Sequence, residues 1–525
     1  MTTPFYVTTA ISYPNGRPHI GHAYEAIAAD VIARFHRMQG RDVRLITGTD
    51  EHGLKMAQTA RAAGRDTLEF ADEMSGYFRE MSAKLNISHD RFVRTSEAGH
   101  KAASTALWEA MVASGDLYLD RYEGWYSVRD EAFYDESELT AGPDGVKLSP
   151  QGTPVEWTAE ESWFFRLSAY QDRLLAHYAA NPDFIRPDSR KNEVLRFVEA
   201  GLRDLSVSRT SFDWGVPVPG SPGHVMYVWV DALTTYLTGI GYPDRGGDFD
   251  RFWPADIHLI GKDIVRFHTV YWPAFLMSAG LPLPKQIFGH GFLLNRGEKM
   301  SKSVGNVVDP MELADRFGVD ALRYYLLREV SFGQDGSYSA EAIIRCANAD
   351  LANSFGNLAQ RSLSMIFKNM GGALKAVERS DADQQLAAKV LAATTDELPQ
   401  AFAALNFSGG IEAWLRAVFA CNQYVDDQAP WTLRKTDPAR MDAVLMTLFT
   451  VIRDLAIAIR PVVPASADRL LDQMGIAADA RDGAALMDVG WFDRLVASGF
   501  TLAQPTPIFP RLELAEGEGD GERAD

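Results

Sequence analysis

The fold of this chain follows from one stretch close to the amino terminus, Tyr13-Pro14-Asn15-Gly16-Arg17-Pro18-His19-Ile20-Gly21-His22. Before it, the aromatic and β-branched residues at 5–10 predict a buried strand. After it, apolar residues recur at helical spacing from Ile20 to Met38, and Gly40 ends the run. A glycine-bearing turn from strand to helix is where an α/β sheet binds nucleotides, because backbone N–H groups and the positive helix end both favour phosphate.

The polar residues of this turn strengthen the prediction of a nucleotide site. His19 and His22 supply hydrogen-bond donors for phosphate oxygens, and Gly21 between them would let a flat base lie against the backbone. The same residues also fit an ordinary helix start. The prediction therefore depends on what the rest of the chain supplies.

Composition narrows the class of protein. The 525 residues are 46% hydrophobic and 23% charged, and no apolar run reaches the roughly 18 residues of a membrane helix. The net charge of −18 argues against indiscriminate nucleic-acid binding, but not against a shaped RNA held by local basic patches. The chain has only two cysteines, Cys346 and Cys421, which is too few for a disulfide scaffold or a thiolate zinc cluster. With no leader segment before the first strand, a cytoplasmic protein without membrane contact is expected.

Later strand-like runs predict that the first strand belongs to a doubly wound parallel α/β sheet. Residues 43–47 predict a second strand, with Asp50 at its carboxyl end, where such sheets bind ligands. An equally good interpretation is that Asp50 caps the next helix. Residues 226–231, 256–261 and 286–292 predict three further strands.

Changes of pattern along the chain predict its domains. Short strand-like pieces and many turns indicate an insertion that splits the sheet, and long helical patterns indicate a helical region behind it. The expected segments are a first nucleotide-binding half at 1–116, the insertion at 117–224, a second half at 225–295, a connecting region at 296–347, a helical domain at 348–510 and an acidic, disordered tail at 511–525.

A second motif follows the last predicted strand. It is Gly297-Glu298-Lys299-Met300-Ser301-Lys302-Ser303, a polar loop with two lysines three residues apart. A lysine pair in a surface loop carries little information by itself. Its position after the last strand of a nucleotide-binding sheet makes both lysines candidates for phosphate contacts.

His19-Ile20-Gly21-His22 and Lys299-Met300-Ser301-Lys302-Ser303, in this order and with a helical region behind, resemble the paired signature of the class I aminoacyl-tRNA synthetases. The stretches 201–209 and 212–219 are similar to the methionyl-tRNA synthetases of that class, and the resemblance extends from residue 5 to about residue 470. It implies an enzyme that joins L-methionine to ATP, releases pyrophosphate, and passes the methionyl group from the adenylate to tRNA(Met), for translation initiation and elongation.

The resemblance implies two groups of residues around ATP. His19, His22, Lys299 and Lys302 would stabilise the charge that develops on the phosphates, with the lysine loop closing over ATP. Mg²⁺ would come with the ATP and not sit in a dedicated protein cage. Asp263 would hold a ribose hydroxyl. The implied ATP-binding residues are Asn15, Gly21, Asp263, Met300 and Ser301.

The resemblance also implies a methionine pocket. Asp50 would receive the ammonium group, helped by the backbone of Ile11, and aromatic walls would suit the polarisable sulfur. Tyr13 and His268 would add a hydrogen bond to the sulfur. Each aromatic residue also fits a purely structural role in the core. The residues implied around the side chain are Tyr13, Trp229, Ala232, Leu233, Tyr236, Ile264 and His268.

In the helical region, Asn357, Arg361 and Trp431 match the positions at which this family reads a CAU anticodon. RNA loops are recognised by unstacking bases onto aromatic side chains and hydrogen-bonding their edges. Arg361 on a polar helix face and Trp431 after the break at 429–430 would converge on one loop, whereas Asn353 is expected to be structural.

The insertion departs from many members of the family, which carry cysteine-rich zinc knuckles there. Ser127 and Asp130 stand where a Cys-x-x-Cys pair would fall, so no zinc is expected. The chain also ends without the appended tRNA-binding domain that makes some relatives dimers, so a monomer is expected.

Three other functions compete with this interpretation. The first is another class I synthetase. The synthetases for leucine, isoleucine and valine carry a large editing domain, for which the insertion leaves no room. The synthetase for cysteine needs cysteine zinc ligands, which this chain lacks. A small-molecule adenylate-forming nucleotidyltransferase would not need the long helical region. A non-catalytic RNA-binding relative would not need the two histidines and two lysines.

Overall fold

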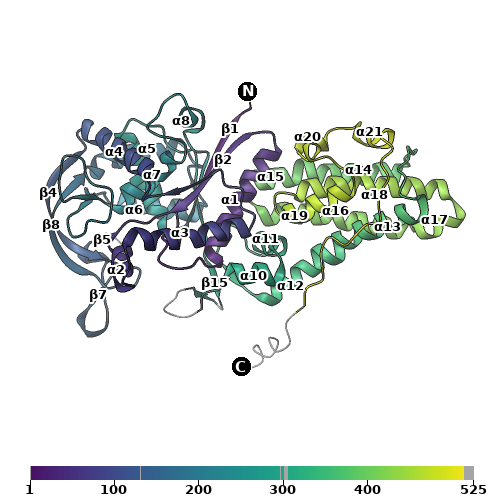
Figure 1. Ribbon diagram of the computed structural model, residues 1–525. Coiled ribbons are helices and arrows are strands. Elements are labelled where there is room, and N and C mark those ends of the chain that lie inside the picture. Colours follow the sequence, from purple (N-terminus) through teal and green to yellow (C-terminus); the bar gives the residue numbers. More distant parts are fainter. Residues whose placement is uncertain (1, 131, 296, 301–305, 514–525) are drawn as a thin grey trace.

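The computed structural model describes residues 2–130, 132–295, 297–300 and 306–513. The molecule is elongated, with an α/β half and a helical half end to end and the helix α1 (Ile20–Met38) at their junction (Figure 1). Within the described residues, no helix is both long and apolar enough to cross a membrane.

The α/β half contains the parallel sheet that the sequence predicts, and this sheet has six strands. Its strand order is β3-β2-β1-β13-β14-β9, so the chain adds strands on one side of β1 and later on the other. Doubly wound sheets bind ligands at such a reversal, outside the carboxyl ends of the strands. The strands are β1 (Pro4–Thr9), β2 (Asp42–Thr49), β3 (Arg91–Arg94), β9 (Ile185–Arg186), β13 (Ile257–Gly261) and β14 (Ile287–His290).

Helices pack on both faces of the sheet because successive strand residues point to opposite sides. On β1, Phe5 and Val7 belong to the apolar core that contains α1, whereas Tyr6 belongs to the core that contains the helices on the other face. The other helices of this half outside the insertion are α2 (Leu54–Ala62), α3 (Thr67–Lys84), α4 (Ala98–Ala113), α7 (Val228–Thr238), α8 (Asp248–Phe252) and α9 (Trp272–Ser278).

One predicted strand is wrong. The sequence predicts a strand at 226–231, but only β12 (Val225–Met226) is extended, and it pairs with β11 (Ser208–Arg209) outside the main sheet. The helix α7 begins at Val228, and every residue of it except Trp229 is buried. A helix enclosed on nearly all sides gives an unbroken apolar run, which a buried strand also gives, so periodicity does not distinguish them.

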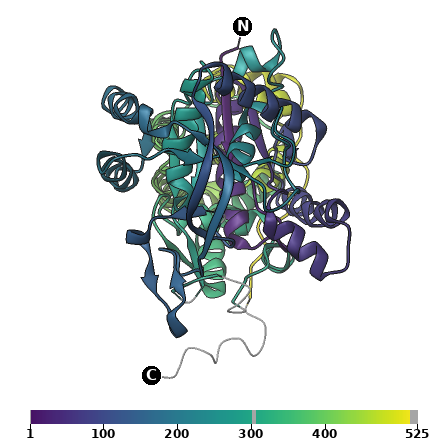
Figure 2. The ribbon, with the colours of Figure 1, turned by 90° about the vertical axis from the view of Figure 1, so that its left-hand side faces the viewer.

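The insertion forms an antiparallel sheet at the far end of the α/β half, seen in front in Figure 2. Its order is β10-β8-β4-β5, and it also supplies β9 to the edge of the main sheet, which the sequence does not predict. Its elements are β4 (Leu117–Ser127), β5 (Ala132–Tyr134), β6 (Thr140–Ala141), β7 (Lys147–Leu148), β8 (Glu156–Phe165), α5 (Gln171–Ala180), α6 (Asp188–Glu199) and β10 (Leu205–Ser206).

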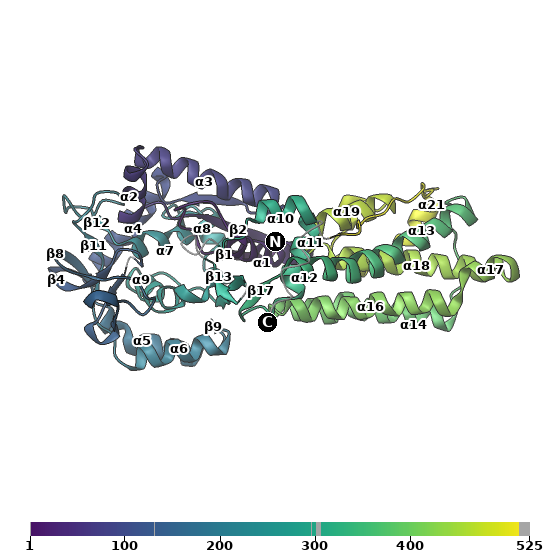
Figure 3. The ribbon, with the colours of Figure 1, turned by 90° about the horizontal axis from the view of Figure 1, so that it is seen from below.

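The helical half is a bundle of long helices (Figure 3). The predicted helical character of this region is confirmed, and so is the break at 429–430 before Trp431, because Ala429 has a φ of 43°. Its helices are α10 (Pro310–Phe317), α11 (Val319–Arg328), α12 (Ala340–Cys346), α13 (Asn357–Met370), α14 (Asp381–Ala392), α15 (Leu398–Ala403), α16 (Phe407–Gln428), α17 (Pro430–Thr436), α18 (Pro438–Ile459), α19 (Pro464–Gln473), α20 (Gly483–Leu486) and α21 (Trp491–Ala497).

A small sheet of β15 (Leu293–Asn295), β16 (Glu298–Lys299) and β17 (Gly336–Tyr338) connects the two halves. Beyond it, α12 continues through the π-helical segment Ala347–Gly356 into α13. The predicted domain boundary after residue 347 therefore falls inside a continuous helical run. The domain boundaries stay predictions.

Arg323 on α11 ties the two halves together from a fully buried position. It donates to the carbonyl oxygens of Pro461 (2.9 Å) and Val462 (3.0 Å), at the corner between α18 and α19. It also donates to the carbonyl oxygen of Leu85 (3.1 Å) and to the Asp30 carboxylate on α1 (2.7 Å). One guanidinium thus holds three segments that are far apart in the sequence.

Replacing Arg323 with leucine should destabilise the protein strongly. The change leaves the buried Asp30 carboxylate with one cation fewer and three carbonyl groups without a donor, and breaking a buried pair in this way costs about 3–5 kcal/mol. We expect a clear fall in the melting temperature measured by calorimetry.

The matched control is Arg34→Leu, which removes the other cation on Asp30 (2.7 Å). The Arg34 side chain is 23% exposed, so its loss should cost less than that of Arg323. Equal losses for the two variants would contradict this account of Arg323.

Candidate active site

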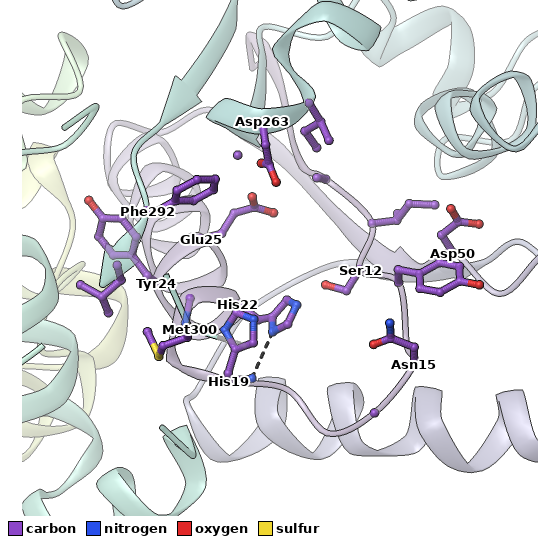
Figure 4. A pocket seen from close by; sticks show the side chains of 18 of the residues that line it. Ser12, Asn15, His19, His22, Tyr24, Glu25, Asp50, Asp263, Phe292 and Met300 are labelled. Atoms are coloured by element: carbon purple, nitrogen blue, oxygen red, sulfur yellow. Dashed lines mark hydrogen bonds between the residues drawn. The ribbon is translucent and has the colours of Figure 1, made fainter. Parts of the chain in front are cut away.

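A cavity of about 680 Å³ opens where the strand order reverses, beyond the carboxyl ends of β1 and β13 (Figure 4). Its volume lies within the range of small-molecule sites, about 300–1,000 Å³. The loop after β1, the end of β2, and the segments after β13 and β14 form its walls. The predicted site residues that line it are Ile11, Tyr13, Asn15, His19, Gly21, His22, Asp50, Trp229, Asp263, Ile264 and Met300.

His19 and His22 cap the first turn of α1. The Nδ1 atom of His19 accepts a hydrogen bond from the Gly21 N–H (3.0 Å), and Nδ1 of His22 accepts one from the His19 N–H (3.1 Å). Since a backbone N–H can only donate, both Nδ1 atoms are acceptors, and the neutral rings carry their hydrogen on Nε2. The two histidines thus satisfy the backbone of the helix end and retain a donor at the ε position.

Position 21 has to be glycine because the His19 ring lies close to its Cα atom. A Cβ at this position would lie 2.8 Å from Cε1 of His19, so any other residue would push the imidazole out of its capping position. The expected contact between Gly21 and a flat base stays a prediction.

Asp50 lies at the end of β2 and is largely buried. Its N–H donates to the Ser12 carbonyl (2.9 Å), and the Ser12 N–H donates to the Gly48 carbonyl (3.0 Å), so the loop after β1 is fastened along the end of β2. The N-cap of α2 is Gly53, so the alternative that Asp50 caps this helix is wrong. Asp50 instead lines the cavity with Ile11 and Tyr13.

Trp229 is the part of α7 that faces the cavity together with Val228. Its ring stacks on Phe267, with centroids 3.8 Å apart and planes 5° apart. The other residues implied for the methionine side chain do not reach the cavity wall; they are buried, and they are Ala232, Leu233, Tyr236 and His268.

Both ring nitrogens of His268 are engaged behind the wall. Nδ1 is 2.9 Å from the Ile264 carbonyl oxygen, which can only accept, so Nδ1 carries the hydrogen. Nε2 therefore accepts from the Tyr236 hydroxyl at 2.6 Å. Burial lowers the pKa of His268 to about 4, which keeps this ring neutral. In this arrangement His268 has no hydrogen left for the expected bond to a methionine sulfur.

Glu25 and His290 form a buried pair on the cavity wall that the sequence analysis misses (Figure 4 shows Glu25). His290 Nε2 is 2.8 Å from the Glu25 carboxylate, and its Nδ1 is 2.8 Å from the Gly291 carbonyl oxygen. Burial raises the pKa of Glu25. Burial lowers the pKa of His290, but its hydrogen bonds to the Glu25 carboxylate and the Gly291 carbonyl, together with the negative charges of Glu25 and Asp263, outweigh burial, so the net pKa of His290 is raised. Helical spacing could have identified Glu25, because it lies four residues after Gly21 and therefore on the same face of the helix.

The cavity wall also carries cations that the sequence analysis does not single out. Lys55 lies over the Tyr13 ring (5.3 Å), and Arg17 over the Tyr77 ring (4.4 Å). Arg129 reaches the wall from the insertion. The same wall carries the carboxylates of Glu25, Asp50, Asp130 and Asp263, so it offers partners to both the anionic and the cationic groups of a ligand.

The lysine motif is only partly described. Its Lys299 backbone pairs with Leu294 in the small sheet, and Met300 is buried against the cavity. The side chain of Lys299, and Ser301 and Lys302 altogether, lie outside the described residues.

Hydrogen bonds hold the turn of the insertion that carries Ser127 and Asp130. The Asp130 carboxylate accepts from the hydroxyls of Tyr134 (3.0 Å), Ser149 (2.6 Å) and Thr153, and Ser127 is hydrogen-bonded to Thr153 (2.7 Å). In the part of the chain that the structure describes, no group of three or more His, Cys, Asp or Glu side chains could hold a metal ion.

In the helical half, Arg361 is tied to α16. It donates to Asn422 (3.1 Å) and pairs with Asp426 (3.4 Å), neither of which the sequence analysis names. The following helix, α17, carries Trp431, whose side chain is 52% exposed. Asn357 is exposed on α13. Both Figures 1 and 3 place α17 at the end of the molecule opposite the insertion.

Asn353, expected to be structural, accepts a hydrogen bond from Arg511 (3.3 Å). This contact fastens the final segment of the described chain to the first long helical run of the bundle.

The pKa of His268 makes the stability of the protein depend on pH. The ordinary histidine pKa is 6.5 and the folded value about 4, so between these values the unfolded chain binds more protons than the folded one. Stability should therefore fall as the pH drops through this window, by about 3 kcal/mol from this group. His268→Gln removes the titration, so its melting temperature should approach that of the wild type from pH 7 to pH 4.5. A constant difference across this range would contradict the assignment.

Two family models match the chain. Residues 5–363 match the model described as "tRNA synthetases class I (M)", and residues 375–520 match the "Anticodon binding domain of methionyl tRNA ligase".

Individual relatives and solved structures agree with these models. The methionine--tRNA ligase of Brucella suis is 56% identical over 523 residues, which are 98% of each chain. That of Mycobacterium tuberculosis H37Rv is 56% identical over 97% of this chain and 98% of its own. The M. tuberculosis methionyl-tRNA synthetase in complex with methionyl-adenylate has a TM-score of 0.92 and 56% identity, covering 97% of this chain and 100% of that one. Its apo form has a TM-score of 0.86 and 52% identity, covering 98% and 99%.

Proposed function

This chain belongs to the methionyl-tRNA synthetase family of class I, and on that premise we propose that it ligates L-methionine to tRNA(Met) through a methionyl-adenylate. The observation that carries the proposal is the cavity at the reversal of the sheet, lined by His19, His22, Asp50 and Trp229. The two family matches favour this function over another class I synthetase or a small-molecule nucleotidyltransferase.

In the first step, the methionine carboxylate attacks the α-phosphorus of ATP, and pyrophosphate leaves. Negative charge grows on the phosphate oxygens during the attack, and donors fixed in advance stabilise that charge most effectively. The Nε2 hydrogens of His19 and His22 are such donors, because their Nδ1 atoms are engaged by the helix end. Lys299 and Lys302 would add positive charge. Mg²⁺ would be held by the ATP phosphates and would neutralise part of their charge.

The nucleotide would lie along the first turn of α1. Gly21 leaves room beside the His19 ring, and Asn15, Met300 and Ser301 would complete the ATP site. Asp263, at the turn after β13, would hold a ribose hydroxyl.

Methionine would lie between the end of β2 and α7. Asp50 would receive the ammonium group beside the Ile11 backbone. The thioether would lie against Tyr13, Trp229 and Ile264, with Ala232, Leu233, Tyr236 and His268 as the layer behind them.

In the second step, the ribose hydroxyl at the 3′ end of the tRNA attacks the acyl carbon of the adenylate, the bond between the acyl carbon and the phosphate oxygen breaks, and AMP leaves. Asn357, Arg361 and Trp431 would read the CAU anticodon at the far end of the bundle. An exposed tryptophan suits stacking on an unstacked base, and an arginine held by a neighbouring amide suits hydrogen bonds to a base edge.

We also propose that the protein acts as a cytoplasmic monomer, with the domain boundaries that the sequence predicts. Cys346 and Cys421 are buried free thiols, which suits a reducing compartment.

The first test is pyrophosphate exchange into ATP across a panel of amino acids. We expect exchange with L-methionine and little with L-leucine or L-isoleucine, because the pocket is built for an unbranched side chain ending in a polarisable group. Exchange that depends on another amino acid, or none at all, would contradict the proposed function.

Trp431→Ala should separate the two steps. Stacking on an aromatic side chain is worth about 1–3 kcal/mol per base, so kcat/KM for tRNA aminoacylation should fall about 10- to 100-fold. Methionine-dependent exchange should stay within about twofold of the wild type, because α17 is far from the cavity. Phe419→Ala, which truncates another exposed aromatic of the same half, is the matched control and should leave both activities unchanged. Equal losses of exchange and aminoacylation in Trp431→Ala would refute the anticodon role.

A further inference from the structure

Asp231 on α7 is a fully buried carboxylate with a histidine on each oxygen. Oδ2 accepts from Nδ1 of His52 (2.6 Å), and Oδ1 from Nε2 of His100 (2.5 Å). Burial raises the pKa of Asp231, but the two histidines outweigh it, and the net pKa lies below the ordinary value. Neither histidine belongs to the cavity wall.

The two histidines come from different elements. His100 lies on α4, and its Nδ1 is 2.9 Å from the Thr238 hydroxyl at the other end of α7, so it fastens α4 to α7. His52 lies in the loop after β2, two residues beyond Asp50. The His52 bond, by contrast, joins α7 to the loop that continues from Asp50 at the end of β2.

The loop that carries His52 is held rigidly. The His52 ring packs edge-to-face against Trp214 (5.5 Å). Trp214 Nε1 donates to the Glu51 carbonyl (2.6 Å), and the Gly53 N–H donates to the Trp214 carbonyl (3.1 Å). The His52 ring, Trp214 and the loop that begins at Asp50 therefore form one packed unit, and Asp231 is bonded to that unit through His52.

The geometry of α7 gives the other end of the connection. Trp229 and Asp231 are two residues apart, about 200° around the helix, so they lie on opposite faces. Trp229 lines the cavity and stacks on Phe267, whereas Asp231 points to the loop after β2. The His52–Asp231 bond thus joins the wall that carries Asp50 to the wall that carries Trp229.

We propose that the His52–Asp231 hydrogen bond fixes the separation of Asp50 and Trp229, and thereby the length of amino-acid side chain that the pocket accepts. The inference rests on the proposed methionine site. His52 is a positioning residue, since it acts through Asp50 and through Asp231 and does not line the cavity. A purely structural role would lower stability without changing which amino acid is used.

Three variants separate these roles. His52→Leu removes the donor. His52→Asn keeps one, because the side-chain amide nitrogen of asparagine is bonded to Cγ, as Nδ1 of histidine is. His100→Leu removes the other donor to the same carboxylate and is the matched control. Pyrophosphate exchange is measured with L-methionine and with L-ethionine, which is one methylene longer, at varied amino acid and varied ATP.

His52→Leu should raise KM for methionine about tenfold and lower the preference for methionine over ethionine about tenfold, as expected for the loss of a hydrogen bond to a charged group. KM for ATP should change less than about twofold, since the ATP site does not depend on this bond. His52→Asn should restore both quantities to near the wild type. His100→Leu should lower the melting temperature but leave KM for methionine and the preference unchanged.

An unchanged preference in His52→Leu would overturn the inference, and so would the same shift in His52→Leu and His100→Leu. If His52→Leu does not fold, His52→Gln, which moves the donor to the ε position, should show the same shift, and wild-type behaviour in it would overturn the inference equally. Absence of methionine-dependent exchange in the wild type would overturn the proposed function, and with it this inference.

Discussion

The buried ion pair between Asp30 and Arg323 is the constraint on which the rest of the structure depends. It holds α1 against α11 and against the corner between α18 and α19, where Arg323 also satisfies two carbonyl groups. Removing a partner from a buried carboxylate is costly. Because Asp30 lies on α1 and its partner Arg323 lies on α11, their ion pair fixes α1 relative to the helices behind it. The first turn of the same helix carries His19 and His22, and a residue one turn further on, Glu25, lines the cavity. The helix that bears the candidate phosphate donors is therefore also the one that joins the α/β half to the bundle.

Local patterns were sufficient to predict the parts of the structure that local interactions form. The turn at 13–22 and Asp50 lie where the sequence puts them, because strand, turn and helix signals follow one another within a few residues. The strands β3 and β9 were missed for the opposite reason, since each is very short and is recruited to the sheet edge by pairing with a distant strand. The helix α7 was taken for a strand because burial on nearly all sides removed its helical periodicity.

Much of the candidate site could not be read from the sequence, because its partners are brought together only by folding. Glu25 and His290 are 265 residues apart, and His52 and Asp231 are 179 apart. No spacing rule relates such pairs. The family resemblance supplied several residues that line the cavity, but it is silent about which of them hold the others in place. The three-dimensional structure adds those supporting contacts, and a binding site depends on them because they hold the lining side chains in position.

The position of His268 bears on how a thioether would be selected. The resemblance implies a hydrogen bond from His268 to sulfur, yet Nδ1 donates to the Ile264 carbonyl and Nε2 accepts from Tyr236. A thioether is only a weak acceptor, so exchanging the Tyr236 bond for one to sulfur would lose energy. In this arrangement, only Tyr13 of the two implied donors would be left for the sulfur, and the rest of the selection would come from shape and polarisability at the Trp229 ring stacked on Phe267. Shape selection needs rigid walls at a fixed distance, which is why the contacts that hold α7 against the loop after β2 matter as much as the residues that would touch the ligand.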